Sequence, residues 1–131
     1  MRRLLLLVAV LGLAAVSFTA QPQAAARRTF VVFFEEWSAA LDAPALKTIA
    51  AAAQAASQQP GASVSVTGFA DPLGSVQANI YLTETRAQVV TDQLTADGVG
   101  TARIQQHAAG KVPYQLTSQE SRRVVITVGG P

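Results

Sequence analysis

The order of two hydrophobic periodicities limits the fold of this chain more than any other feature of its sequence. Residues 62–69 alternate apolar and polar side chains, as a half-buried strand does. Residues 29–34 and 122–128 are rich in β-branched and aromatic side chains and predict buried strands, and residues 103–107 predict a weaker one. In two other segments apolar residues recur every three or four positions, which predicts two amphipathic helices.

Capping residues predict where these helices begin and end. Asp42, followed two positions later by a proline, fits the start of the first helix, and the Pro-Gly pair in 58–61 stops it. Thr83 is predicted as the N-cap of the second helix, which places Arg86 in its first turn. Gly98 is expected to end that helix in the left-handed conformation.

The predicted elements imply two layers. Each helix has one apolar stripe to bury, so both helices are expected to cover the same face of a single sheet. Strand–helix–strand connections make some strands parallel or separated by an intervening strand, and the last two strands are expected to be inserted antiparallel. The sequence therefore predicts an α+β fold, a two-layer sandwich β-α-β-α-β-β with the helices on one face of a mixed sheet. Residues 109–120 are expected to form a loop.

The N-terminal segment has the pattern of a secretory signal peptide. A short basic start precedes an apolar run of about 13 residues, too short for a transmembrane span of roughly 20, and small residues follow it. Cleavage after Ala26 would remove residues 1–26 and leave residues 27–131 as one domain; Ser17 and Ala20 are alternative cleavage sites. Membrane attachment is expected only if this leader stays uncleaved.

Composition excludes several classes of function. The chain of 131 residues has no cysteine, which rules out a disulfide scaffold, a zinc–thiolate site, a thiol nucleophile and a lipid anchor on cysteine. His107 is the only histidine and is expected to be packed or at the surface rather than a metal ligand. Ten basic residues less Arg2 and Arg3 equal the eight acidic ones, and this zero net charge gives nucleic-acid binding no support.

Asp71 and Arg86 form a candidate binding pair. Asp71 follows the second predicted strand, and a basic residue in a first helical turn opposes the helix dipole, so Arg86 needs another reason to be there. An arginine fork at a helix start suits a carboxylate, and an aspartate suits an ammonium group, so together they suit a zwitterion. The alternatives are that Asp71 only begins a turn, and that the two residues form a structural ion pair.

Several short motifs, in their order and spacing, resemble the OmpA-like periplasmic domain family. They are Gly68-Phe69-Ala70-Asp71, Gly74, Asn79, Leu82-Thr83-Glu84-Thr85-Arg86-Ala87, Gly98-Val99 and Ser121-Arg122-Arg123-Val124. The corresponding family pattern is Gly-His-Thr-Asp, Gly, Tyr-Asn, Leu-Ser-x-x-Arg-Ala, Gly-Val and Asn-Arg-Arg-Val. The resemblance spans about residues 30–128. The chain departs from this pattern at Phe69, Ala70, Ala78 and Ser121, which stand where the family has His, Thr, Tyr and Asn.

The resemblance implies a non-catalytic domain that binds peptidoglycan through the free amino and carboxylate end of diaminopimelate in the stem peptide. It further implies the periplasm of a Gram-negative bacterium, at the outer membrane or cell wall. In the family the aspartate takes the amino group and the arginine the carboxylate, and these positions are Asp71 and Arg86 here. The further candidate ligand residues are Phe69, Ala70, Asn79 and Arg122. Arg122 and Arg123 alternate across a strand, so at most one of them can face the site.

Two other classes of function compete with this one. The alternative is an OmpA-like protein-interaction domain that has lost ligand binding and has an envelope protein as its partner. An enzyme is disfavoured because the sequence presents no nucleophile with its base, and adjacent Glu35 and Glu36 point to opposite faces. No catalytic residue, metal or cofactor is expected. Trp37 is expected in the core or at its edge, with sugar stacking as the alternative.

Overall fold

The computed structural model describes residues 15–17, 26–70, 74–111 and 121–130. The predicted signal peptide lies outside the described residues apart from residues 15–17 and 26. Asp71 and residues 112–120 of the expected loop also lie outside them.

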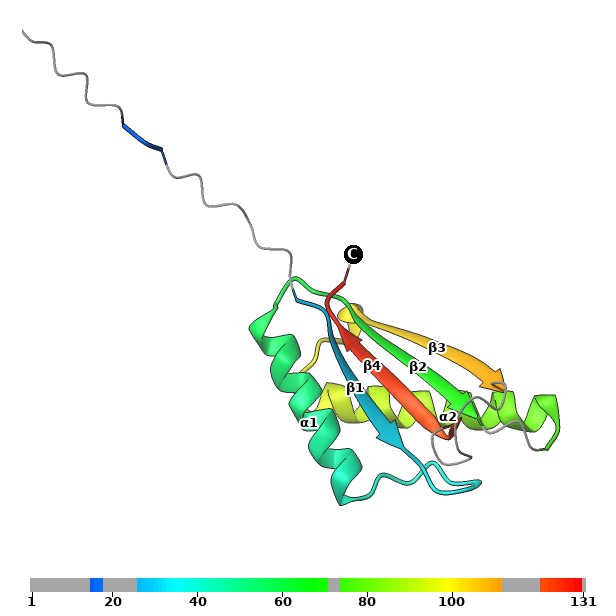
Figure 1. Ribbon diagram of the computed structural model, residues 1–131. Helices are drawn as coiled ribbons and strands as arrows, with labels where there is room; N and C mark the ends of the chain where they lie inside the picture. The colour runs from blue at the N-terminus through cyan, green and yellow to red at the C-terminus, as the bar shows by residue number, and fades with distance from the viewer. Residues whose placement is uncertain (1–14, 18–25, 71–73, 112–120, 131) are drawn as a thin grey trace, which may run out of the picture.

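A four-stranded sheet forms one layer of the molecule (Figure 1). Its strands are β1 (Arg28–Phe33), β2 (Val64–Ala70), β3 (Ile104–Lys111) and β4 (Arg123–Val128), in the order β1-β4-β2-β3. β4 lies between β1 and β2 and is antiparallel to both, which confirms the expected mixed sheet. β3 was expected to be antiparallel as well, and this is wrong. It runs parallel to β2 at the edge of the sheet, because a helix carries the chain back between them.

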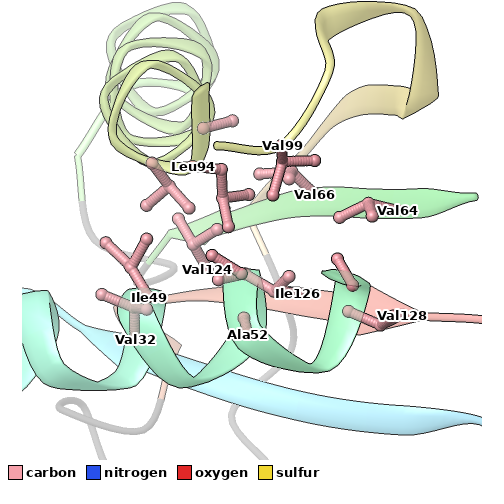
Figure 2. Packing of buried hydrophobic residues seen from close by; sticks show 14 of the residues in the cluster. Val32, Ile49, Ala52, Val64, Val66, Leu94, Val99, Val124, Ile126 and Val128 are labelled. Atoms are coloured by element: carbon pink, nitrogen blue, oxygen red, sulfur yellow. The ribbon is translucent and has the colours of Figure 1, made fainter. Parts of the chain in front are cut away.

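The helices α1 (Ala43–Gln58) and α2 (Val76–Ala96) form the other layer, on one face of the sheet (Figure 1). The predicted architecture is therefore confirmed. Figure 2 shows Ile49 and Ala52 of α1 and Leu94 of α2 packed with the valines of the sheet, and all three are fully buried. Neither helix in the described part of the chain has the length and apolarity needed to cross a bilayer.

Two of the predicted helix ends are confirmed. Asp42 caps α1, its Oδ1 accepting a hydrogen bond from the backbone N–H of Ala45 at 2.9 Å. At the other end of the helical layer, Gly98 has a φ of 104° and follows α2. The N–H of Val99 donates to the carbonyl of Leu94 at 3.0 Å, a Schellman motif that satisfies a terminal carbonyl of the helix.

The predicted start of α2 is wrong. Its N-cap is Ser75, eight positions before Thr83, and the Ser75 hydroxyl accepts a hydrogen bond from the Ala78 N–H at 3.1 Å. Thr83 is instead buried within the helix and donates its hydroxyl to the Ile80 carbonyl at 2.8 Å. The first turns carry exposed apolar residues, among them Val76, so they lack the single apolar stripe by which a helix is located in a sequence.

Candidate functional site

Arg86 is the centre of the candidate site. Its side chain is fully buried on the inner face of α2. Its Nε donates a hydrogen bond to the carbonyl of Ser38 at 2.7 Å, and its Nη2 donates to the carbonyl of Glu35 at 2.9 Å. The guanidinium lies over the ring of Phe34, 5.1 Å from its centroid, which adds a cation–π contact. Arg86 therefore fastens α2 to the turn that follows β1.

The helix-start argument for Arg86 is wrong. Because α2 begins at Val76, Arg86 lies in the interior of the helix, where backbone N–H groups are bonded along the helix itself. No free N–H groups of a helix start can therefore join its guanidinium in holding a carboxylate. The positive charge does lie in a region of low exposure, where electrostatic interactions are stronger than in water.

The turn held by Arg86 contains Trp37, whose backbone conformation is unusual. The N–H of Ser38 donates to the carbonyl of Glu35 at 3.1 Å, and between them Trp37 has a φ of 54°. This left-handed conformation is rare for a bulky residue and costs on the order of 1–3 kcal/mol. The side chain was expected in or beside the core, but it is 56% exposed. Its ring lies against Gly74, where a Cβ would be 2.7 Å from Cη2 of the indole.

Gly68, the glycine of the motif that contains Asp71, occupies a position where a side chain would clash. A Cβ at this position would lie 2.5 Å from the backbone oxygen of Thr83. α2 can approach β2 this closely only because Gly68 has no side chain. Since Thr83 precedes Arg86 by about one helical turn, this close approach sets how Arg86 lies relative to the end of β2.

Gly68→Ala is expected to lower the free energy of unfolding by about 2–3 kcal/mol, because the methyl group meets helix backbone rather than a flexible side chain. Gly61→Ala is the matched control, since a Cβ there has no atom within 4 Å. Urea denaturation followed by circular dichroism measures both variants. Equal stability of the two would contradict the close packing of α2 on β2.

The other predicted ligand residues divide between the two faces of the sheet. Ala70 is buried, and Asn79 is nearly so, with its Nδ2 donating to the Ser75 carbonyl at 2.9 Å. Arg122 donates from Nε to the Phe34 carbonyl at 3.2 Å, which brings it next to the residue that Arg86 covers. Ala70 therefore faces the helices, Asn79 lies near the start of α2, and Arg122 lies beside Phe34.

Phe69 lies on the opposite face. Residues of β2 alternate, and Gly68 and Ala70 are buried beneath the helices, so the ring of Phe69 points away from them. There it packs under the guanidinium of Arg123, 4.4 Å from the ring centroid. Phe69 therefore lies away from Arg86, on the same face as Arg123. That at most one of the two adjacent arginines faces the ligand site stays a prediction.

Several contributors to the site were not found from the sequence. The main-chain carbonyls of Glu35 and Ser38 leave no signal in residue types, and the sequence predicts Phe34 only as part of a strand. Within the described residues, no group of three or more His, Asp or Glu side chains could hold a metal ion. His107 is exposed on β3, in agreement with a surface position.

Comparison with known proteins identifies the family. The model of the OmpA family matches residues 33–125. The peptidoglycan-associated lipoprotein of Agrobacterium fabrum is 30% identical over 105 residues, which cover 76% of this chain and 59% of that protein. The chain thus spans about three-fifths of the length of that relative.

Solved structures share the fold at lower identity. The OmpA-like domain of FopA1 from Francisella tularensis superposes with a TM-score of 0.70 at 23% identity, covering 80% of this chain and 73% of that one. The peptidoglycan-associated lipoprotein from Burkholderia pseudomallei gives 0.69 at 24% identity, with coverages of 77% and 90%. The cell wall anchor of the type VI secretion system from Pseudomonas aeruginosa gives 0.63 at 24% identity, with coverages of 80% and 82%. Sequence match and fold together show that this chain belongs to the OmpA family.

Proposed function

We propose that this domain binds peptidoglycan without catalysis, through the free amino and carboxylate end of diaminopimelate in the stem peptide. Membership of the OmpA family supports the proposal. So do relatives whose names describe a peptidoglycan-associated lipoprotein and a cell wall anchor. The ligand groups in this proposal are those of the sequence motifs, with Asp71 opposite the ammonium group and Arg86 opposite the carboxylate.

The observation that carries the proposal is a buried arginine fixed by main-chain carbonyls of the turn that follows β1. The carbonyl contacts and the Phe34 ring hold the guanidinium in one orientation, so the position of its positive charge is fixed before a ligand binds. Asp71 follows Ala70, the last residue of β2, in the sequence and supplies the negative charge. A carbon that carries both an ammonium and a carboxylate group needs a negative and a positive charge within one small site.

The burial of Arg86 limits how it can act. The exposed fraction of Arg86 is 0%, so a ligand carboxylate contacts it directly only after displacing a group that covers it. Without such displacement, the guanidinium attracts the carboxylate through a short stretch of protein of low dielectric constant. In both cases the positive charge lowers the free energy of a carboxylate placed above it. Asn79, Ala70 and Arg122 line the same region in this proposal, whereas Phe69 is on the far face of the sheet.

Co-sedimentation with purified sacculi tests the proposal. The folded domain is expected to sediment with diaminopimelate-containing sacculi and to be released by free diaminopimelate as competitor. Asp71→Asn is expected to sediment less, and Asp97→Asn is its charge-matched control, because this exposed residue follows α2 at its C-terminal end. A folded domain that stays in the supernatant would refute the proposal and favour the alternative of an interaction domain for an envelope protein.

Export to the periplasm belongs to the same proposal, with residues 1–26 as signal peptide and residues 27–131 as the domain at the cell wall or outer membrane. The mature protein is expected to begin at Arg27, because Ala24 and Ala26 satisfy the small-residue requirement of the cleavage site. Mass spectrometry of the periplasmic fraction measures this terminus. An intact Met1 on a membrane-bound protein would contradict it.

A further inference from the structure

Trp37 has two properties that packing does not explain. It is the only tryptophan of the chain, and it is more than half exposed to solvent. Its backbone is also left-handed, a conformation that L-residues with large side chains rarely adopt. Backbone strain of this kind persists where the surrounding structure enforces it, and it concentrates at binding sites.

The surrounding structure holds both the backbone of Trp37 and one edge of its indole ring. The turn that carries Trp37 is closed by the hydrogen bond from Ser38 to Glu35, and the same Glu35 carbonyl accepts from Arg86. The ring lies against Gly74, at a distance that leaves no room for a side chain there. A ring fixed in this way loses little conformational entropy when a ligand covers it.

The groups beside the indole favour an uncharged, hydroxyl-rich ligand. Glu35 and Glu36, which directly precede Trp37, are exposed, and their carboxylates accept hydrogen bonds from hydroxyl groups. A stable protein interface needs about 800 Å² from each partner around an apolar centre, and the sequence neighbours of Trp37 are instead polar. An exposed indole with such acceptors in the two preceding residues suits the C–H face of a sugar ring and its hydroxyls.

We propose that Trp37 stacks on a sugar ring of the peptidoglycan glycan, next to the site for the stem peptide. This inference rests on the proposed function. Arg86 connects the two contacts, because it fastens the turn that carries Trp37 while its charge serves the peptide end. The domain then recognises the junction of glycan and peptide rather than either part alone.

Isothermal titration with two ligands tests this inference. One ligand is a diaminopimelate-containing stem peptide without sugar, and the other is the same peptide attached to its disaccharide. The disaccharide-bearing ligand is expected to bind the native domain roughly tenfold more tightly, with a tenfold change corresponding to 1.4 kcal/mol. Trp37→Asn is expected to remove that gain and leave the affinity for the bare peptide unchanged, because Asn tolerates a positive φ.

Two further variants sharpen the comparison. Trp37→Phe retains an aromatic face and is expected to keep part of the gain. Tyr81→Asn is the matched control, because Tyr81 is a 73% exposed aromatic residue that lines a separate open groove between α2 and β3. It is expected to bind both ligands as the native domain does.

The outcomes separate this inference from the proposed function. If the native domain binds both ligands equally well, Trp37 does not contact sugar, while binding of the stem peptide stands. If it binds neither ligand, the proposed function fails and the inference fails with it. Should Trp37→Asn not fold, the emission of the single tryptophan decides the question in the native protein. The disaccharide-bearing ligand should protect it from acrylamide quenching more than the bare peptide, and equal quenching would overturn the inference.

Discussion

Arg86→Ala is expected to lower the free energy of unfolding by about 3–5 kcal/mol. Two hydrogen bonds from a charged donor are lost, each worth roughly 1.5–3 kcal/mol, and a cavity opens beside Phe34. Denaturation in urea, followed by circular dichroism, measures the loss. A domain of this size is marginally stable, so a loss of this extent unfolds a substantial fraction of the protein.

Two control variants show whether the loss of stability comes from the contacts of Arg86. Arg86→Lys keeps the charge but lacks the planar fork that serves two carbonyls and stacks on a ring, so an intermediate loss is expected. Arg27→Ala removes an exposed arginine and is expected to change stability by less than about 0.5 kcal/mol. If Arg86→Ala is as stable as Arg27→Ala, Arg86 does not fasten the turn after β1 to α2.

Asp71→Ala is expected to weaken binding of a diaminopimelate-containing stem peptide by about 2–5 kcal/mol, provided that the contact is desolvated, because it leaves the ammonium group of the ligand without its opposite charge. Calorimetric titration of the folded variant measures the change. Asp71→Asn retains the size of the side chain and isolates the effect of charge. Asp97→Asn changes the net charge equally at an exposed position and is expected to bind as the native domain does.

The pair is expected to be non-additive. Arg86→Lys combined with Asp71→Asn should weaken binding by less than the sum of the two single changes, because each disables the same two-point contact with one ligand. Strict additivity would indicate that the two residues act on separate groups. Unchanged affinity in Asp71→Asn would remove Asp71 from the site.

The sheet and its layers could be predicted because the information is local. Period-two alternation in 62–69 and the β-branched run in 122–128 assign strands without knowledge of distant residues. Gly98 likewise ends α2 through hydrogen bonds to its own last turn. The start of α2 was missed because Val76 and Ile80 are exposed apolar residues, which hide the stripe that marks a helix.

The site was harder to predict because its contacts join distant parts of the chain. Arg86 is separated from its two carbonyl acceptors by 48 and 51 positions, and a main-chain acceptor leaves no trace in residue types. The resemblance selected the residue, but neither its burial nor its interior place in α2 could follow from the motif. Phe69 was selected by the same resemblance, through the motif that contains Asp71, although strand alternation with buried Gly68 on its own indicates the opposite face.

One titration tests the central claim most directly. The native domain is titrated with a stem peptide that ends in diaminopimelate and with the same peptide carrying lysine instead. Lysine retains the amino group but lacks the carboxylate at the free end, so it removes only the charge assigned to Arg86. The account predicts binding of the diaminopimelate peptide and a loss of about 2 kcal/mol or more with lysine. Equal affinity for the two peptides would contradict recognition of the zwitterionic end.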